Sequence, residues 1–195
     1  MQAIDTLLKR RSAKTLTDPA PDEGALQLLL ECASRAPDHG RLRPWRFIVI
    51  RGAGRERLGE LMAEQLRRKQ PAASSEALQR ERQKALRAPL IIVVAAVRDA
   101  ASKVPEIEQI LAAAAAAQNM MLAATALGFG SMWKTGDVAY DDQVKVALGL
   151  QAADAIVGFL YLGSAPPDAV PPPARPQWED RVRYWGEPVP FSEHT

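Results

Sequence analysis

The sequence predicts an α+β domain of two or three layers, in which helices and short strands interleave around a small sheet. Its 195 residues are 47% apolar and 25% charged, which is the composition of a globular chain with a sizeable core. Segments with helical periodicity outnumber the short apolar runs that have the length of strands. The runs that we expect to build the sheet are residues 45–50, 89–97, 129–134 and 155–162.

The first part of the chain predicts two helices ahead of the first strand. Apolar side chains at helical spacing indicate a short amphipathic helix over residues 2–10. Asp22 can cap a second helix. That helix is expected to stop at Ala36, because Pro37 disfavours helical geometry in the residue before it. The polar loop 37–44 then leads into the first strand.

The middle of the chain predicts more helices around the remaining strands. Two charged helices are expected, one roughly over 54–69 and one ending near Leu86, with a break at the small residues 71–75. The segment 104–127 reads as a long helix that is alanine-rich almost all round. Such a surface suits close packing against other helices, within the subunit or across a dimer. A short helix is expected near 141–148.

The chain divides into a domain and a tail. Residues 1–163 are predicted to form a single domain, and residues 164–195 a proline-rich arm with extended backbone. The arm contains an aromatic and charged segment at 178–185. Aromatic side chains this late in a chain need a surface on which to dock, and we expect the arm to pack on a partner subunit.

The bulk properties argue against several classes of protein. The formal net charge is only +2 and no basic run is long, so a nucleic-acid partner is not expected. The sequence contains no uninterrupted apolar stretch of about 18 residues, so it predicts no membrane helix. The charged first eleven residues do not resemble a signal peptide, and the single cysteine, Cys32, fits a reducing compartment. A cytoplasmic protein is therefore expected.

Common catalytic motifs do not occur in the sequence. It has no G-x-G-x-x-G after a strand and no P-loop, so a Rossmann-type dinucleotide site is not indicated. It also has no C-x-x-C, H-E-x-x-H or G-x-S-x-G motif. With one cysteine and two histidines, a structural zinc site is not expected. Hydrolytic and metal-dependent chemistry therefore lose support.

A first candidate site is the run Arg10-Arg11-Ser12 at the end of the first helix. Two guanidinium groups and a hydroxyl provide donors suited to a phosphate group. The alternative is that the two arginines only complement the helix C-terminus and remain in solvent.

A second candidate site runs from Arg35 through His39 and ends at Trp45. His39 is one of only two histidines, and several arginines surround it in the sequence. A rigid loop with cations and an imidazole could hold an anionic or electron-rich ring. The alternative is an exposed loop histidine without a ligand.

A third candidate site is the segment 128–136. Its three glycines permit close approach of a ligand to the backbone, while Trp133, Lys134 and Thr135 offer a flat ring, a cation and a hydroxyl. The alternative is a helix C-cap followed by an ordinary strand and turn, with Trp133 in the core.

Six motifs in order resemble the nitroreductase family, in particular its compact bacterial branch. The resemblance covers about residues 1–163. The motifs lie at residues 7–13, 35–50, 87–92, 103–109, 128–136 and 155–163. The implied fold has a small mixed or antiparallel central sheet flanked by helices, and the implied assembly is a homodimer.

The resemblance also implies two sites for tightly but non-covalently bound FMN, both at the dimer interface. The FMN-binding residues of one subunit would be Arg10, Arg11, Ser12, Trp133, Lys134 and Thr135. Those of the other subunit would be Arg35 and His39. The residues that correspond to a segment assigned to NAD(P) in this branch are Ala123, Ala124, Thr125, Ala126, Leu127 and Gly128.

The expected activity is that of an FMN-dependent oxidoreductase. NAD(P)H would reduce the flavin, which would then reduce a nitroaromatic, quinone or similar small acceptor in a ping-pong mechanism. The cofactor carries the chemistry, so no side chain is nominated as catalytic. Two alternatives remain open at this point. One is a flavoenzyme of the same fold that performs fragmentation or dehalogenation, and the other is a basic binding module without activity.

Overall fold

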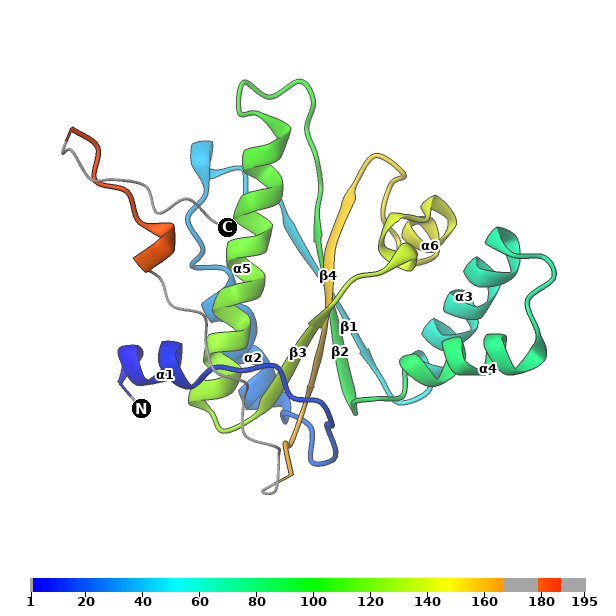
Figure 1. The fold of residues 1–195 in the computed structure, drawn as a ribbon. Helices are drawn as coiled ribbons and strands as arrows, with labels where there is room; N and C mark the ends of the chain where they lie inside the picture. The colour runs from blue at the N-terminus through cyan, green and yellow to red at the C-terminus, as the bar shows by residue number, and fades with distance from the viewer. Residues whose placement is uncertain (1, 167–178, 187–195) are drawn as a thin grey trace.

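The computed structural model describes residues 2–166 and 179–186 and has an antiparallel four-stranded sheet at its centre (Figure 1). The strands follow the order β1-β2-β4-β3, and each neighbouring pair is antiparallel. Their bounds are Trp45–Arg51 for β1, Leu90–Ala96 for β2, Gly130–Lys134 for β3 and Ala155–Gly163 for β4. All four strands lie where the apolar runs predict them.

Six α-helices and three short 3₁₀ turns complete the described part of the chain. The helices are α1 (Ala3–Lys9), α2 (Glu23–Ala33), α3 (Ala53–Lys69), α4 (Ser75–Lys84), α5 (Glu106–Ala126) and α6 (Asp142–Ala147). The 3₁₀ turns are η1 (His39–Arg41), η2 (Asp137–Tyr140) and η3 (Glu179–Arg181).

The second helix follows its prediction at one end and differs at the other. The side chain of Asp22 accepts a hydrogen bond from the Ala25 N–H at 2.8 Å, as an N-cap should. The helix ends at Ala33 instead of Ala36. The following residues tighten into i→i+3 turns, in which the Ala36 N–H donates to the Ala33 carbonyl at 3.1 Å. The predicted end of this helix was therefore three residues too late.

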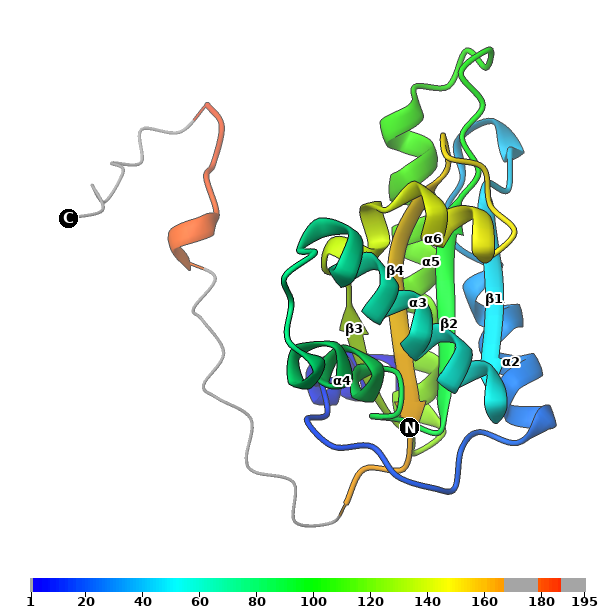
Figure 2. The ribbon, with the colours of Figure 1, turned by 90° about the vertical axis from the view of Figure 1, so that its right-hand side faces the viewer.

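The sheet lies between two helical layers, so the domain has three layers (Figures 1 and 2). Helices α2 and α5 cover one face, and α3, α4 and α6 lie over the other. Every residue of strand β2 is buried, so the sheet needs a helical layer on each of its two faces. One set of its alternating side chains joins the core under α2 and α5, and the other set joins the second core.

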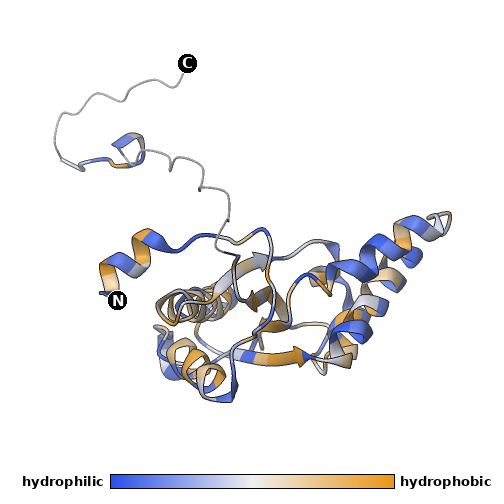
Figure 3. Cartoon of the chain, turned by 90° about the horizontal axis from the view of Figure 1, so that it is seen from below, coloured by the Kyte–Doolittle hydropathy of each residue, from blue (hydrophilic) through white to orange (hydrophobic). Residues whose placement is uncertain are grey.

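The two helical layers differ in character. Helices α3 and α4 are largely hydrophilic, while the helices on the other side carry much more apolar surface (Figure 3). Helix α5 buries its alanines against α2 and the sheet, and the Asn119 side chain donates to the Cys32 carbonyl at 3.2 Å. The alanine-rich segment therefore allows the close packing that its composition predicts.

Most of the predicted proline-rich arm lies outside the described residues. This applies to residues 167–178 and 187–195, so the prediction that the arm packs on a partner subunit stays a prediction. Within residues 2–166 and 179–186, no helix has the length and apolar character needed to cross a membrane.

Candidate functional site

The segment that follows α1 lies alongside the first residues of β3. The chain leaves the helix at Arg10, whose N–H donates to the Thr6 carbonyl at 2.9 Å. Ser12 then forms a parallel bridge with Ser131, and the Ala13 N–H donates to the Ser131 carbonyl at 2.9 Å. Two predicted site segments that are far apart in the sequence, 10–12 and 128–136, are thus side by side.

The far end of β3 presents Trp133, Lys134 and Thr135. The Trp133 indole N–H donates to the Val157 carbonyl at 3.1 Å, and the ring lies directly over Gly158. A side chain at Gly158 would collide with this ring. Trp133 is therefore fixed and half-buried, whereas Lys134 and Thr135 are exposed. The structure thus agrees with the alternative interpretation of this segment, because a helix end leads into an ordinary strand on which Trp133 packs against the core.

A buried hydroxyl, that of Ser131, lies on β3 between the contact with Ser12 and the far end of the strand. The Ser131 side chain is 1% exposed, and its Oγ has no hydrogen-bond partner among the described residues. A buried polar atom without a partner is uncommon in a folded protein and calls for a physical explanation. Together with the guanidinium groups of Arg10 and Arg11 and the Ser12 hydroxyl, this donor set fits a cofactor that carries a phosphate and polar groups.

The loop that carries His39 has an unusual backbone. Gly40, Arg41 and Arg43 have φ values of 72°, 55° and 48°, which lie in the left-handed region that non-glycine residues rarely adopt. The carboxylate of Asp38 closes the loop by accepting from the Arg43 N–H at 2.6 Å. Such strain persists only where the surrounding contacts hold it, and it is typical of ligand-binding segments.

His39 also has a side-chain partner that the sequence analysis did not identify. Its Nδ1 lies 2.6 Å from Oε2 of Glu108, in the first turns of α5. Glu108 lies in one of the six motifs, at residues 103–109, but no role is predicted for it from the sequence. The two residues are 69 positions apart, so no local periodicity indicates the contact.

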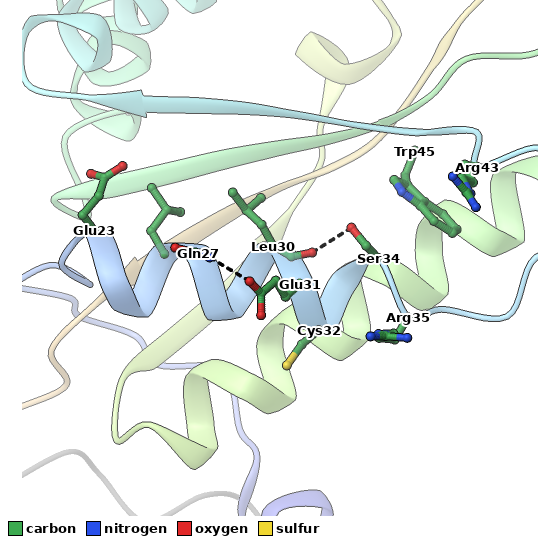
Figure 4. A pocket seen from close by; sticks show the side chains of 10 residues that line it. Glu23, Gln27, Leu30, Glu31, Cys32, Ser34, Arg35, Arg43 and Trp45 are labelled. Carbon is green, nitrogen blue, oxygen red and sulfur yellow. Dashed lines mark hydrogen bonds between the residues drawn. The ribbon is translucent and has the colours of Figure 1, made fainter.

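Arg35 lies at one end of a groove between α2 and β1, with a volume of about 930 Å³ (Figure 4). Figure 4 places Arg35, Arg43 and Trp45 together at this end and Glu23 at the other. The groove is lined by Glu23, Leu26, Gln27, Leu30, Glu31, Cys32, Ser34, Arg35, Arg43 and Trp45. Two guanidinium groups beside an indole make this end of the groove suited to an anionic or aromatic group.

The two halves of the predicted FMN site are not brought together within one chain. His39 contacts Glu108 near the start of α5, whereas Ser12 contacts Ser131 just after this helix ends. The helix has 21 residues, which corresponds to about 30 Å. Figure 1 likewise shows η1 beside one end of α5 and the segment after α1 beside the other. A single chain therefore presents the two predicted half-sites apart from each other.

The predicted NAD(P) segment, residues 123–128, forms a complete helix C-cap. The Phe129 N–H donates to the Ala124 carbonyl at 2.8 Å and the Gly128 N–H to the Thr125 carbonyl at 3.1 Å. Gly128 has a φ of 86°. This is the Schellman arrangement, which accounts for the glycine structurally. The nucleotide role of the segment stays a prediction.

Two ion pairs fasten the segment after Thr135 to α3. Lys69 contacts Asp137 at 2.6 Å, and Arg68 contacts Asp141 at 2.7 Å. Burial alone would raise the pKa of Asp141, but hydrogen bonds from Arg68 and from the Val144 N–H outweigh it and lower the pKa below its ordinary value. Among the described residues, no group of three or more His, Cys, Asp and Glu side chains is placed to hold a metal ion.

Comparisons with known proteins agree with this architecture. The model of the nitroreductase family matches residues 7–164. The Escherichia coli (strain K12) protein YdjA, named as a candidate NAD(P)H nitroreductase, is 43% identical over 166 residues, which span 84% of this chain and 88% of YdjA. The crystal structure of a nitroreductase-like family protein from Bacillus cereus has a TM-score of 0.82 at 27% identity and covers 96% of this chain and 97% of its own.

One further solved structure contains a ligand. It is a candidate nitroreductase from Desulfovibrio desulfuricans in complex with FMN, with a TM-score of 0.73 and 26% identity. The match covers 97% of this chain and 99% of that protein. The similarity of fold therefore extends over nearly the full length of both chains.

Proposed function

The chain belongs to the nitroreductase family, and we propose that it is an FMN-dependent oxidoreductase that uses NAD(P)H to reduce nitroaromatic, quinone or similar small acceptors. The observation that carries this proposal is the placement of Arg10, Arg11 and Ser12 beside the strand that ends in Trp133 and Lys134. The FMN complex of the similar Desulfovibrio protein supports the choice of cofactor.

The side chains of this site suit the binding and tuning of FMN. When bound, FMN supplies the hydride and electron chemistry, which no protein side chain can provide. Arg10, Arg11 and the Ser12 hydroxyl would hold the phosphate through charge-assisted hydrogen bonds. Lys134, and Thr135 beside it, would place a cation and a donor near the ring system. No residue of the chain needs to act as a nucleophile, and we assign none as catalytic.

We further propose a homodimer in which each FMN site combines half-sites of two subunits. Arg35 and His39 would come from the partner of the subunit that supplies Arg10. Exposed apolar side chains on α1 and α5 support an interface there, because surfaces of this kind mark sites of association. They are Ile4 and Leu8, each 66% exposed, and Ile107 and Leu111, 59% and 58% exposed.

Four finer assignments complete the proposal. Residues 1–163 act as one FMN-binding domain, and the arm 164–195 packs on the partner subunit. The end of α5, residues 123–128, contributes to binding of NAD(P)H. The single cysteine, Cys32, is consistent with a cytoplasmic location.

Spectroscopy and steady-state kinetics test the proposal. The purified protein should show the absorption bands of FMN, or gain them when FMN is added. It should then oxidise NAD(P)H in the presence of an acceptor, with parallel initial-rate lines when both substrates are varied. Protein that stays colourless with added FMN would contradict the proposal, and intersecting lines with a ternary complex would contradict the ping-pong order.

A screen of acceptors decides between the reductase and the other flavin chemistries open to this fold. Protein reduced in advance should transfer electrons rapidly to nitroaromatics or quinones in stopped-flow mixing. If it reacts with none of them and instead breaks a carbon–halogen bond or fragments a flavin, the reductase assignment is wrong.

A further inference from the structure

We propose that Glu108 is a positioning residue for His39. It accepts the hydrogen bond of Nδ1 and thereby presents a bare Nε2 to the flavin bound by the partner subunit. This inference rests on the proposed FMN function. Glu108 belongs to one of the six motifs but is not among the proposed FMN-binding residues. Its Oε2 lies 2.6 Å from Nδ1 of His39.

The exposure of the pair indicates that its purpose is not stability. The side chains of His39 and Glu108 are 65% and 42% exposed, and ion pairs in such positions contribute little to the free energy of folding. A carboxylate next to an imidazole has a second effect, which does not depend on burial. It selects which ring nitrogen carries the proton and fixes the orientation of the ring.

Both partners are attached to well-held backbone, so the contact is preorganised. Gly40, next to His39, packs so closely on Val104 that a Cβ there would lie 3.0 Å from the Val104 side chain. On the other side, Gln109 is buried and its side chain donates to the carbonyls of Val104 and Asp99. The loop and the start of α5 are therefore held together by contacts on both sides of the pair.

The chemistry of the two groups determines the tautomer. An ionised carboxylate is only an acceptor, so the nitrogen that faces Glu108 must carry the proton. In a neutral imidazole the other nitrogen, Nε2, then has a free lone pair. The flavin ring has one N–H on its pyrimidine edge, the imide N3–H, and a bare Nε2 could accept from it. The opposite tautomer would place two N–H groups against each other.

Nuclear magnetic resonance of labelled histidine tests this inference directly. The chain has two histidines, His39 and His194, so a His194→Gln variant assigns the signals. In ¹⁵N-histidine-labelled holoprotein at pH 8, His39 should show a protonated Nδ1 and a bare Nε2. Glu108→Ala should release it into a mixture of both tautomers, and Glu108→Gln should retain only part of the preference, because its amide oxygen can accept from Nδ1–H but its NH₂ group can also donate to a bare Nδ1.

Binding of FMN provides the second measurement. Glu108→Ala should weaken FMN binding by about tenfold, the ratio that corresponds to one hydrogen bond. Glu108→Gln should remain within about threefold of the wild type because the acceptor remains. Glu106→Ala is the matched control, since Glu106 lies in the same turns of α5, is 44% exposed and pairs with Arg98 at 2.8 Å. It should change neither the tautomer nor FMN binding.

The outcomes separate this inference from the function on which it rests. A bare Nδ1 in the wild type, or a tautomer that Glu108→Ala does not alter, would overturn it. The same holds if Glu108→Ala binds FMN as tightly as the wild type. Wild-type protein that binds no FMN would contradict the proposed function, while the tautomer of His39 measured in the FMN-free protein would still decide whether Glu108 positions the ring.

Discussion

Trp133 and Gly158 form a matched pair at the edge of the candidate site. The indole is held by its hydrogen bond to the Val157 carbonyl and lies where any side chain at position 158 would be. The indole N–H therefore already has a partner within the chain, and only the shape and face of the ring would be available to a ligand. In the proposed site the hydrogen-bond donors to FMN are instead the exposed neighbours Lys134 and Thr135.

The phosphate-binding role is tested at single residues. Arg10→Ala and Ser12→Ala should each weaken FMN binding by about tenfold or more, because each removes a donor to a charged phosphate. Fluorescence quenching of added FMN measures the dissociation constant. Arg51→Ala is the control, since Arg51 is exposed and pairs with Glu23 on the opposite edge of the sheet. Unchanged FMN binding in both site variants would show that the phosphate lies elsewhere.

The buried phenol of Tyr161 should make the free energy of unfolding depend on pH in the alkaline range. Burial on β4 raises the pKa of its phenol to about 12 from an ordinary value of 10. Below pH 10 the phenol is neutral in both the folded and the unfolded chain. Between pH 10 and 12 only the unfolded chain ionises, so the free energy of unfolding should fall with rising pH, by on the order of 2 kcal/mol.

Absorbance of the phenolate and denaturant unfolding check this expectation. The chain has three tyrosines, and one should titrate late, near pH 12. Tyr161→Phe should remove the late phase and flatten the alkaline loss of stability, whereas Tyr140→Phe, on the surface, should leave both in place. A late phase that persists in Tyr161→Phe would contradict the assignment.

Among the elements, helix α5 connects the two half-sites and ends in a cap that serves structure first. Its start carries Glu108, which contacts His39, and its end leads through Gly128 into β3. The cap satisfies the last carbonyl groups of the helix and sets the direction in which the chain enters the sheet. The position of Trp133 therefore depends on how α5 ends.

The cap allows the nucleotide role of the segment 123–128 to be separated from its structural role. Gly128→Ala should lower the free energy of unfolding by about 1 kcal/mol, because the φ of 86° is strained for alanine. Gly149→Ala is a matched control, with a φ of 79° and open space around the added Cβ. Both variants should lose similar stability in thermal unfolding, but only Gly128→Ala should raise the KM for NAD(P)H. An equal KM in both variants would leave the segment with its structural role alone.

Local patterns predicted the elements well and their assembly less well. The strand at Leu90–Ala96 is apolar on both faces and was predicted as covered on both sides, which is what the two cores confirm. The strand order could not be predicted, because pairings such as Trp45 with Ala96 and Gly130 with Gly163 join residues whose local sequence carries no information on the partner.

For the candidate site, too, the local segments were predicted but the long-range contacts were not. The motifs named the segments 10–12 and 128–136, and the structure places them side by side. The Glu108 contact was missed, because it depends on a loop with left-handed residues at positions 40, 41 and 43. Glycine at position 40 is a weak signal of such a loop, but arginine at the other two positions gives no signal at all.

For the whole molecule, the central observation is that the two predicted half-sites are separated within one chain. The half-site at Arg10 and Ser12 and the half-site at His39 lie toward opposite ends of a helix of about 30 Å. The proposed homodimer with two-fold symmetry would bring them together, because it would place each half-site of one subunit against the complementary half-site of the other. Variants that prevent the association of subunits should therefore also lose flavin binding.

The proposed division of the site across two subunits also has a consequence for genetics. An Arg10→Ala chain and a His39→Ala chain should each form dimers in which both sites are defective. When the two chains are co-expressed, however, one site of every mixed dimer contains both substitutions. The other site has Arg10 from one subunit and His39 from the other and is intact. With random pairing, about a quarter of the wild-type flavin content and activity should return, and alleles of this gene should complement each other in the same cell. Co-expression that restores neither would show that each subunit builds its site alone.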